Sequence, residues 1–219
     1  MRERFTTELK ELQERALGCL DAGAVALDHA VAALIARDRP RAGRCVAEID
    51  QLERHATEVE SVLLTFIARQ SPVAGDLLLT AALLEVIGDA QRIAHQCMSI
   101  AKRVSLCGPE VATSAECVTC LERMGEVAHD LIVRARAGFA ERAPELAADL
   151  DRRDDELDRA NRECFRIALR ISADREISEW AMCMMLAARA LERVGDNAVS
   201  VARQVDYMGP SRESTAGSA

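Results

Sequence analysis

Apolar residues recur at alternating spacings of three and four over most of the chain, and this pattern constrains the fold more than any other feature. One run reads Cys45, Ile49, Leu52, Ala56, Val59, Leu63 and Phe66. Residues 5–30 and 111–139 follow the same spacing. A sustained period of about 3.5 residues places apolar side chains on one stripe of a long α-helix that packs against others at small angles. With no strand pattern visible, we predict an all-α protein.

Prolines divide the chain into these helices. The prolines that we expect to open helices, because the first helical turn tolerates proline, are Pro40, Pro72, Pro109 and Pro144. Ser71 is a candidate cap, and a break at 172–178 with Asp174 as cap divides the last long segment. This gives six helices of about 30 residues each, with consecutive helices antiparallel. Residues 211–219 have little to bury and are predicted to be disordered.

An internal repeat indicates two similar halves. "QRIAHQCMSIAK" (91–102) aligns with "ERVGDNAVSVAR" (192–203), so that Gln91 matches Glu192 at a spacing of 101 residues. A competing match of "LEVIGD" with "LERVGD", spaced 107 residues apart, fails immediately downstream. We favour the longer match, which predicts two repeated three-helix bundles over residues 1–108 and 109–210.

Composition excludes several classes of protein. The formal net charge is −8, which argues against a nucleic-acid-binding protein, because phosphate contacts require a basic surface. We find no apolar run of about 18 residues and no signal peptide in "MRERFTTELKEL", and therefore expect a cytoplasmic protein that is not inserted in a membrane. Eight cysteines include one C-x-x-C, Cys117 and Cys120, but no second pair follows. We interpret them as reduced thiols that fill the core.

Glu192 and Asp196 are the first candidate metal ligands. They are four residues apart, so that both carboxylates lie on one face of a helix, and Gly195 between them leaves room for a close approach. If the last two helices turn near residue 175, Asp158 faces Glu192 and Asp154 faces Asp196. Four ionised carboxylates on one seam require a cation or protons. Oxygen ligands suit magnesium, calcium, manganese or iron.

A second interpretation stays open for Asp154 and Asp158. Asp154 and Asp158 are surrounded in sequence by Arg152, Arg153, Arg159 and Arg162. Surface salt bridges to these arginines are as compatible with the pattern as metal ligation.

A weaker site is predicted in the first half. A hairpin turning near residue 72 would place Asp50 opposite His95 and Glu53 near Gln91. This set has less charge and one nitrogen ligand, and it suits a single zinc ion or no metal at all. The other histidines fit no cluster and are expected at the solvent-exposed surface; they are His29, His55 and His129.

Three stretches resemble the PhoU family of phosphate-signalling regulators. They are "RQSPVAGDLLL" (69–79), "DAQRIAHQCMSIAKR" (89–103) and "ALERVGDNAVSVARQVDYMGP" (190–210). The family has Pro-x-x-x-Asp-Leu near the start of the third helix and a metal-binding E-x-x-x-D motif in the third and sixth. The second motif is intact at Glu192 and Asp196, whereas the first has Gln91 and His95 in the two acidic positions.

The resemblance implies a cytoplasmic, non-enzymatic, metal-binding regulator built from two three-helix bundles. It implies restraint of the phosphate-starvation response through a sensor histidine kinase and the ATPase subunit of the phosphate ABC transporter, and a homodimer. The rival interpretation is a metal-storage protein or a di-metal carboxylate enzyme. That class carries Glu-x-x-His pairs on two helices, and the sequence has this spacing once, at Glu126 and His129.

Overall fold

The computed structural model describes residues 2–106 and 113–208, which form six long helices joined by short connections. The helices are α1 (Arg2–Ala36), α2 (Arg39–Gln70), α3 (Gly75–Arg103), α4 (Ala115–Glu141), α5 (Pro144–Ile171) and α6 (Ser178–Met208). The shortest has 27 residues and the longest 35. The prediction of an all-α protein with six long helices is confirmed.

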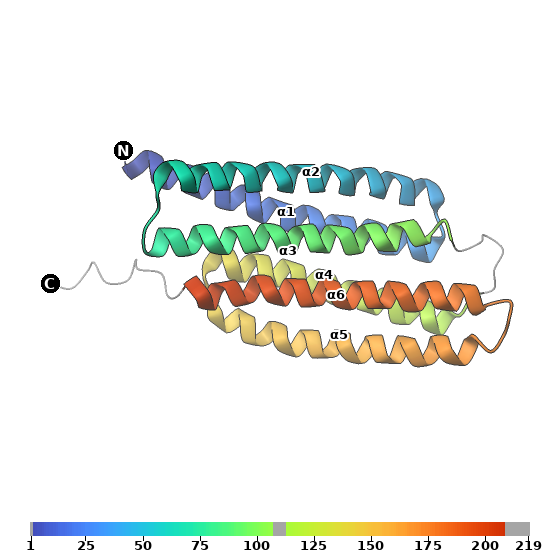
Figure 1. Ribbon diagram of the computed structural model, residues 1–219. Helices are drawn as coiled ribbons and strands as arrows, with labels where there is room; N and C mark the ends of the chain where they lie inside the picture. Colours follow the sequence, from blue (N-terminus) through green and yellow to red (C-terminus); the bar gives the residue numbers. More distant parts are fainter. Residues whose placement is uncertain (1, 107–112, 209–219) are drawn as a thin grey trace.

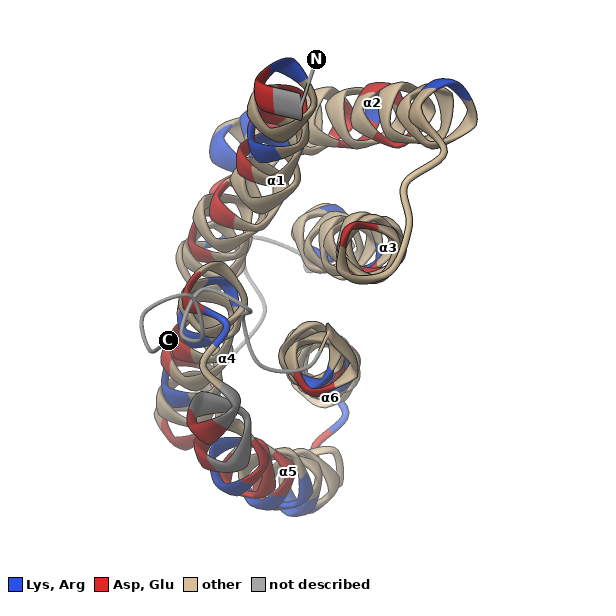
Figure 2. Cartoon of the chain, turned by 90° about the vertical axis from the view of Figure 1, so that its left-hand side faces the viewer, with Lys and Arg blue, Asp and Glu red and all other residues tan. Residues whose placement is uncertain are grey.

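The helices run side by side and reverse direction at each connection (Figure 1). Helices α1, α2 and α3 contact one another, and α4, α5 and α6 do the same. Between the two bundles α3 packs against α6, and α1 packs against α4. Seen end-on, α3 and α6 lie next to each other inside a curved array formed by the other four helices (Figure 2).

Burial follows the 101-residue register. Five fully or nearly fully buried residues of α3, namely Leu83, Ile87, Ala90, Ile93 and Cys97, match Met184, Ala188, Leu191, Val194 and Ala198 of α6, which are buried as well. The 107-residue register would instead align buried Asp89 with exposed Asp196. The longer sequence match is therefore the one that the packing supports. The boundary at 108/109, the helix start at Pro109 and the tail at 211–219 lie outside the described residues.

The predicted helix starts are right at two prolines and wrong at a third. Pro40 and Pro144 lie in the first turns of α2 and α5. Pro72 instead lies in the connection before α3, and Ser71, with a φ of 46°, ends α2 in the left-handed conformation. The residue before a proline avoids the right-handed helical region, so the chain leaves the helix there.

Asp174 is also not the cap of α6. Its carboxylate accepts a hydrogen bond from the Glu176 N–H at 2.9 Å, within the connection between α5 and α6. Helix α6 begins only at Ser178. An aspartate whose side chain accepts a hydrogen bond from the N–H two residues ahead forms a local turn, and here this turn precedes the first residue of α6.

Helix α1 differs from the expectation that no segment could cross a membrane. It contains an 18-residue window with a mean hydropathy of 1.6, long and apolar enough by composition alone. Half of that window is buried in the bundle, where α1 contacts α2, α3 and α4. The packing explains this composition, because a helix with neighbours on several sides must be apolar on several sides.

Candidate metal centre between helices α5 and α6

Two helices bring four carboxylates to one seam, which we call the acidic seam: Asp154 and Asp158 of α5 with Glu192 and Asp196 of α6. Glu192 is only 8% exposed, whereas Asp196 lies at the surface. One carboxylate oxygen of Glu192 pairs with Arg189. The other oxygen, Oε2, and the Oδ1 of Asp154 are buried without a hydrogen-bond partner. Buried polar atoms normally have partners, so these two oxygens are candidate ligands for a bound ion.

The negative charges of the acidic seam repel one another. Burial raises the pKa of Asp154 to about 6, and the negative charges of Asp196, Asp158 and Glu192 add to this effect. Burial also raises the pKa of Glu192; Arg189 opposes the rise, while Asp196 and Asp158 reinforce it. Near neutral pH the seam therefore holds ionised groups that a bound cation would stabilise.

Gly195 allows α6 to approach α5 at this point. A Cβ added to Gly195 would lie 2.6 Å from Leu157 Cδ2 and 2.7 Å from Asp154 Oδ1. Both distances are shorter than real Cβ contacts, so a side chain here would require the Leu157 and Asp154 side chains to shift. The absence of a side chain at Gly195 thus sets the position of the Asp154 carboxylate against the backbone of α6.

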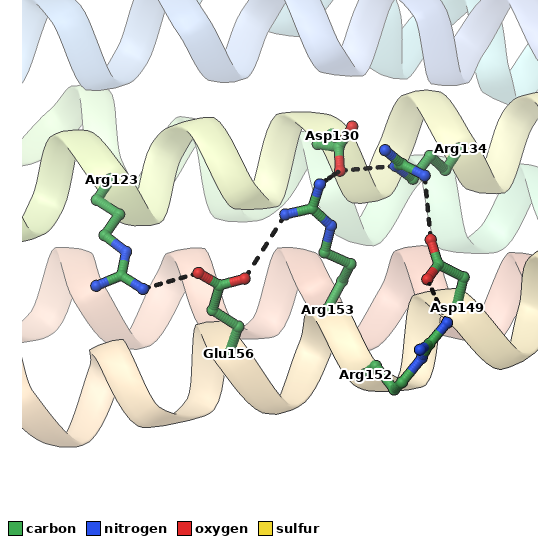
Figure 3. Close-up of polar contacts among 7 residues, drawn as sticks. All are labelled: Arg123, Asp130, Arg134, Asp149, Arg152, Arg153 and Glu156. Carbon is green, nitrogen blue, oxygen red and sulfur yellow. Dashed lines mark hydrogen bonds and ion pairs between the residues drawn. The ribbon is translucent and has the colours of Figure 1, made fainter.

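Two of the arginines near the acidic seam, Arg152 and Arg153, are paired elsewhere. Figure 3 shows a ladder of ion pairs in which Arg153 reaches Asp130 at 3.2 Å and Glu156 at 3.6 Å. The remaining pairs of the ladder are Arg123–Glu156, Arg134–Asp130, Arg134–Asp149 and Arg152–Asp149. Asp158 has a long contact of 3.7 Å with Arg162. The surface salt-bridge alternative thus describes Asp158 in part, and it does not describe Asp154.

The first bundle carries a reduced version of the same seam. At 101 residues before the four acids stand Glu53, Thr57, Gln91 and His95. The His95 Nε2 lies 3.4 Å from Glu53 Oε1. His95 therefore pairs with Glu53 rather than with the expected Asp50. Residues 71–74 are not helical, so the chain reverses at a later residue than predicted. The residues of α3 are therefore shifted along α2 relative to the predicted register.

No group of three or more His, Cys, Asp or Glu side chains in residues 2–106 and 113–208 is arranged closely enough to hold a metal ion. The acidic seam supplies two unpartnered oxygens and two further acids whose charges reach them. The chemistry of this donor set suits a hard cation, because every donor is a carboxylate oxygen.

Asp89 is a buried charge that sequence reasoning placed outside the site. Its side chain is 1% exposed, and its Oδ1 accepts a hydrogen bond of 2.7 Å from Arg92 Nη2. The Nε of Arg92 also donates to Asn197 Oδ1 of α6 at 3.1 Å. Burial raises the pKa of Asp89, and Arg92 opposes the rise. This network joins the two bundles at the contact of α3 with α6.

Two histidines expected at the solvent-exposed surface are half-buried and paired. His29 Nδ1 lies 2.8 Å from Glu48, and His129 Nδ1 lies 3.0 Å from Asp28. Both acids come from a neighbouring helix, which a sequence alone does not reveal. Since His129 pairs with Asp28, nothing at Glu126 and His129 favours a di-metal enzyme.

The comparisons with known proteins agree with this architecture. The PhoU domain family matches residues 21–104 and 121–205, one match within each bundle. A phosphate-specific transport system accessory protein PhoU homolog 2 from Mycobacterium tuberculosis is 28% identical, over 94% of this chain and 97% of its own length. A PhoU homolog from Zymomonas mobilis is 29% identical over 91% of this chain and 84% of its own.

Solved structures show the same fold. The crystal structure of PhoU from Pseudomonas aeruginosa superposes with a TM-score of 0.82 at 26% identity, covering 93% of this chain and 98% of that one. The phosphate transport system regulatory protein PhoU from Streptococcus pneumoniae gives a TM-score of 0.84 at 18% identity, over 93% and 96% of the two chains. With two family matches, relatives over nearly its full length and this helical arrangement, the chain belongs to the PhoU family.

Proposed function

We propose that this chain is a cytoplasmic, non-enzymatic regulator of phosphate uptake that binds a metal ion at the acidic seam. The observation that carries the metal site is the pair of buried, unpartnered oxygens on Glu192 and Asp154. The role in phosphate transport is supported by the relatives, which are named phosphate-specific transport system accessory proteins.

The ion is a hard cation, either iron, manganese, magnesium or calcium, because all the donors of the acidic seam are carboxylate oxygens. Glu192 and Asp154 hold it from the two helices, and Asp158 and Asp196 complete the donor set. When bound, the ion supplies positive charge that neutralises the seam and fixes α5 against α6. In the first bundle a histidine and a glutamine stand in place of two of the acids, and His95 Nε2 lies 3.4 Å from Glu53 Oε1, so we assign no metal to that bundle.

The partners that we propose are the sensor histidine kinase and the ATPase subunit of the phosphate ABC transporter. A protein-binding surface is supported by exposed apolar side chains on the same hairpin as the acidic seam: Phe165 and Leu169 of α5, and Met182 and Leu186 of α6. Each pair is spaced four residues apart and so shares a helix face. Exposed apolar groups that gather on one face mark protein contacts. A homodimer is part of the same proposal.

The metal site is tested by the double substitution Glu192→Ala with Asp196→Ala. Elemental analysis of the purified variant should show less bound metal than the wild type, with helical circular dichroism retained. The control is Glu122→Ala with Glu126→Ala, an acid pair with the same spacing on α4 whose members are both exposed. Metal content that is unchanged in the first variant would refute the site.

The regulatory role is tested in cells. Deletion of the gene should raise expression of the phosphate-uptake genes in phosphate-rich medium, and the wild-type gene should restore repression. Unchanged expression after deletion would contradict the role and leave the family assignment intact.

A further inference from the structure

Three thiols meet where α4 packs against α5. Cys117 and Cys120 lie in the first two turns of α4, and Cys164 lies on α5. The thiols of Cys117 and Cys120 lie near the Cys164 thiol and raise its pKa. Cys120 also donates to the carbonyl oxygen of Ala160, one turn before Cys164, at 3.5 Å. The third thiol of this cluster comes from another helix, and the C-x-x-C spacing alone did not indicate it.

The other described thiols with hydrogen bonds behave as core residues. Cys19, Cys45 and Cys97 donate to backbone carbonyl oxygens at 3.5 to 3.9 Å. Burial raises the pKa of both Cys19 and Cys45 to about 11, which keeps these thiols protonated and unreactive.

The thiol cluster is not a requirement of the repeated fold. At 101 residues before Cys117, Cys120 and Cys164, the first bundle has Ala16, Cys19 and Leu63. An alanine and a leucine thus fill the two buried positions, and the first bundle provides a natural control with one thiol.

Cys120 is the accessible member of the cluster. It is half-buried, whereas Cys117 and Cys164 are fully buried. The neighbouring Cys164 thiol lowers the pKa of Cys120, because it can donate a hydrogen bond to the Cys120 thiolate; burial opposes this effect. The same contacts raise the pKa of Cys164. The arrangement therefore has a half-buried, nucleophilic sulfur next to a protonated thiol on the neighbouring helix.

We propose that Cys120 and Cys164 are a redox site at which a peroxide converts two thiols into a disulfide joining α4 to α5. The Cys120 thiolate attacks hydrogen peroxide, the O–O bond breaks, and hydroxide leaves as Cys120 becomes a sulfenic acid. The Cys164 sulfur then attacks the Cys120 sulfur, and the sulfenic oxygen leaves as water with the Cys164 proton. In total two thiols and one peroxide give one disulfide and two waters.

The choice of partner decides what oxidation does to the protein. A bond between Cys117 and Cys120 would close one turn within α4 and connect nothing else. A bond between Cys120 and Cys164 ties α5, the helix that carries Asp154 and Asp158, to α4. It lies between two ion pairs that also join these helices, Arg123–Glu156 at the end of the ladder in Figure 3 and Arg170–Glu116.

The site is tested on the full chain, reduced and then treated with one equivalent of hydrogen peroxide. Remaining thiols are blocked with iodoacetamide, and tryptic fragments are identified by mass spectrometry. The expected product joins fragment 104–123, which holds Cys120, to fragment 163–166, which holds Cys164. A Cys107→Ser background removes the third thiol of the first fragment. The oxidised chain should also unfold at a higher temperature, because the crosslink restricts the unfolded state.

Variants identify the pair without depending on one substitution. Cys120→Ser and Cys164→Ser should each abolish the joined fragments, whereas Cys117→Ser should retain them. Cys19→Ser, in the repeat-equivalent position, should leave the yield unchanged. The wild-type result stands even if a variant fails to fold. A bond confined to fragment 104–123, or no loss of free thiols at one equivalent of peroxide, would overturn the proposal.

Discussion

Gly195 determines how closely α5 and α6 can approach each other. Gly195→Ala would place a methyl group 2.6 Å from Leu157 Cδ2 and 2.7 Å from Asp154 Oδ1. We expect the free energy of unfolding, measured in urea, to fall by roughly 1–3 kcal/mol, the usual cost of overpacking. Bound metal should fall with it, since the Asp154 carboxylate is displaced.

The matched control is Gly18→Ala in α1, where nothing lies within 4 Å of the new Cβ. Alanine is a better helix former than glycine by about 0.5–1 kcal/mol, so this variant should be as stable as the wild type or more stable. Equal stability of the two variants would contradict the packing argument.

Asp154 makes the stability of the metal-free protein depend on pH. Its pKa rises from 3.8 to about 6 on folding, so in this range the folded chain holds a proton that the unfolded chain has released. The free energy of unfolding therefore falls as the pH rises from about 4 to 6. Asp154→Asn should remove this dependence. At pH 7 with a chelator present, we expect the variant to be more stable by roughly 1–2 kcal/mol after solvent screening is allowed for.

Urea denaturation at several pH values checks this prediction. Below pH 4 the variant and the wild type should be equally stable with respect to this group, because both then carry an uncharged side chain. Asp155→Asn, at an exposed position next in the sequence, is the control and should follow the wild-type profile. A wild-type stability that rises between pH 4 and 6 relative to Asp154→Asn would show that the carboxylate is stabilised rather than strained.

At the scale of the element, the sequence predicts the helices better than it predicts their connections. The 3.5-residue spacing reports a whole buried stripe, and the stripe from Cys45 to Phe66 is buried at every position named for it. A connection depends on one or two residues with competing roles. Ser71 can open a helix or end one, and Asp174 can cap a helix or form a local turn. In the structure Ser71 ends α2 before Pro72, and Asp174 accepts from the Glu176 N–H, so residues next to each one in the sequence select its role.

Within α5, buried packing should contribute more to stability than the ion-pair ladder does. Leu157 is fully buried beside Gly195, so Leu157→Ala should cost about 2–5 kcal/mol. Arg153→Ala removes two ion pairs of a side chain that is 38% exposed and should cost less than about 1 kcal/mol. Thermal or urea denaturation of both variants measures the difference, and the Arg153 pairs should weaken further in high salt. An equal cost for the two substitutions would indicate that the ladder holds α4 and α5 together.

At the scale of the molecule, the two bundles share a fold but differ in their chemistry. The spacing of 101 residues between the repeats was visible in the sequence. It identifies the positions of the first bundle that correspond to the acidic seam. Hairpin geometry in the last two helices predicted Asp154 opposite Asp196 and Asp158 opposite Glu192, and in the structure the charges of these three other acids act on Asp154. The His95–Glu53 pair did not follow from that geometry, because the earlier hairpin turns later than its proline suggests. The Cys164 contact also escaped prediction, since it joins residues that no short motif relates.

This asymmetry predicts one strong metal site per chain. Gln91→Ala with His95→Ala should leave the metal content unchanged, in contrast to the loss expected for Glu192→Ala with Asp196→Ala. Gln91→Glu with His95→Asp should instead add metal, because it rebuilds E-x-x-x-D opposite Glu53, whose Oε1 is buried and without a hydrogen bond. Equilibrium dialysis against manganese, followed by elemental analysis, measures the ratio of metal to chain. Loss of metal in the Gln91→Ala, His95→Ala variant would place an ion in the first bundle and contradict the assignment of the site to α5 and α6.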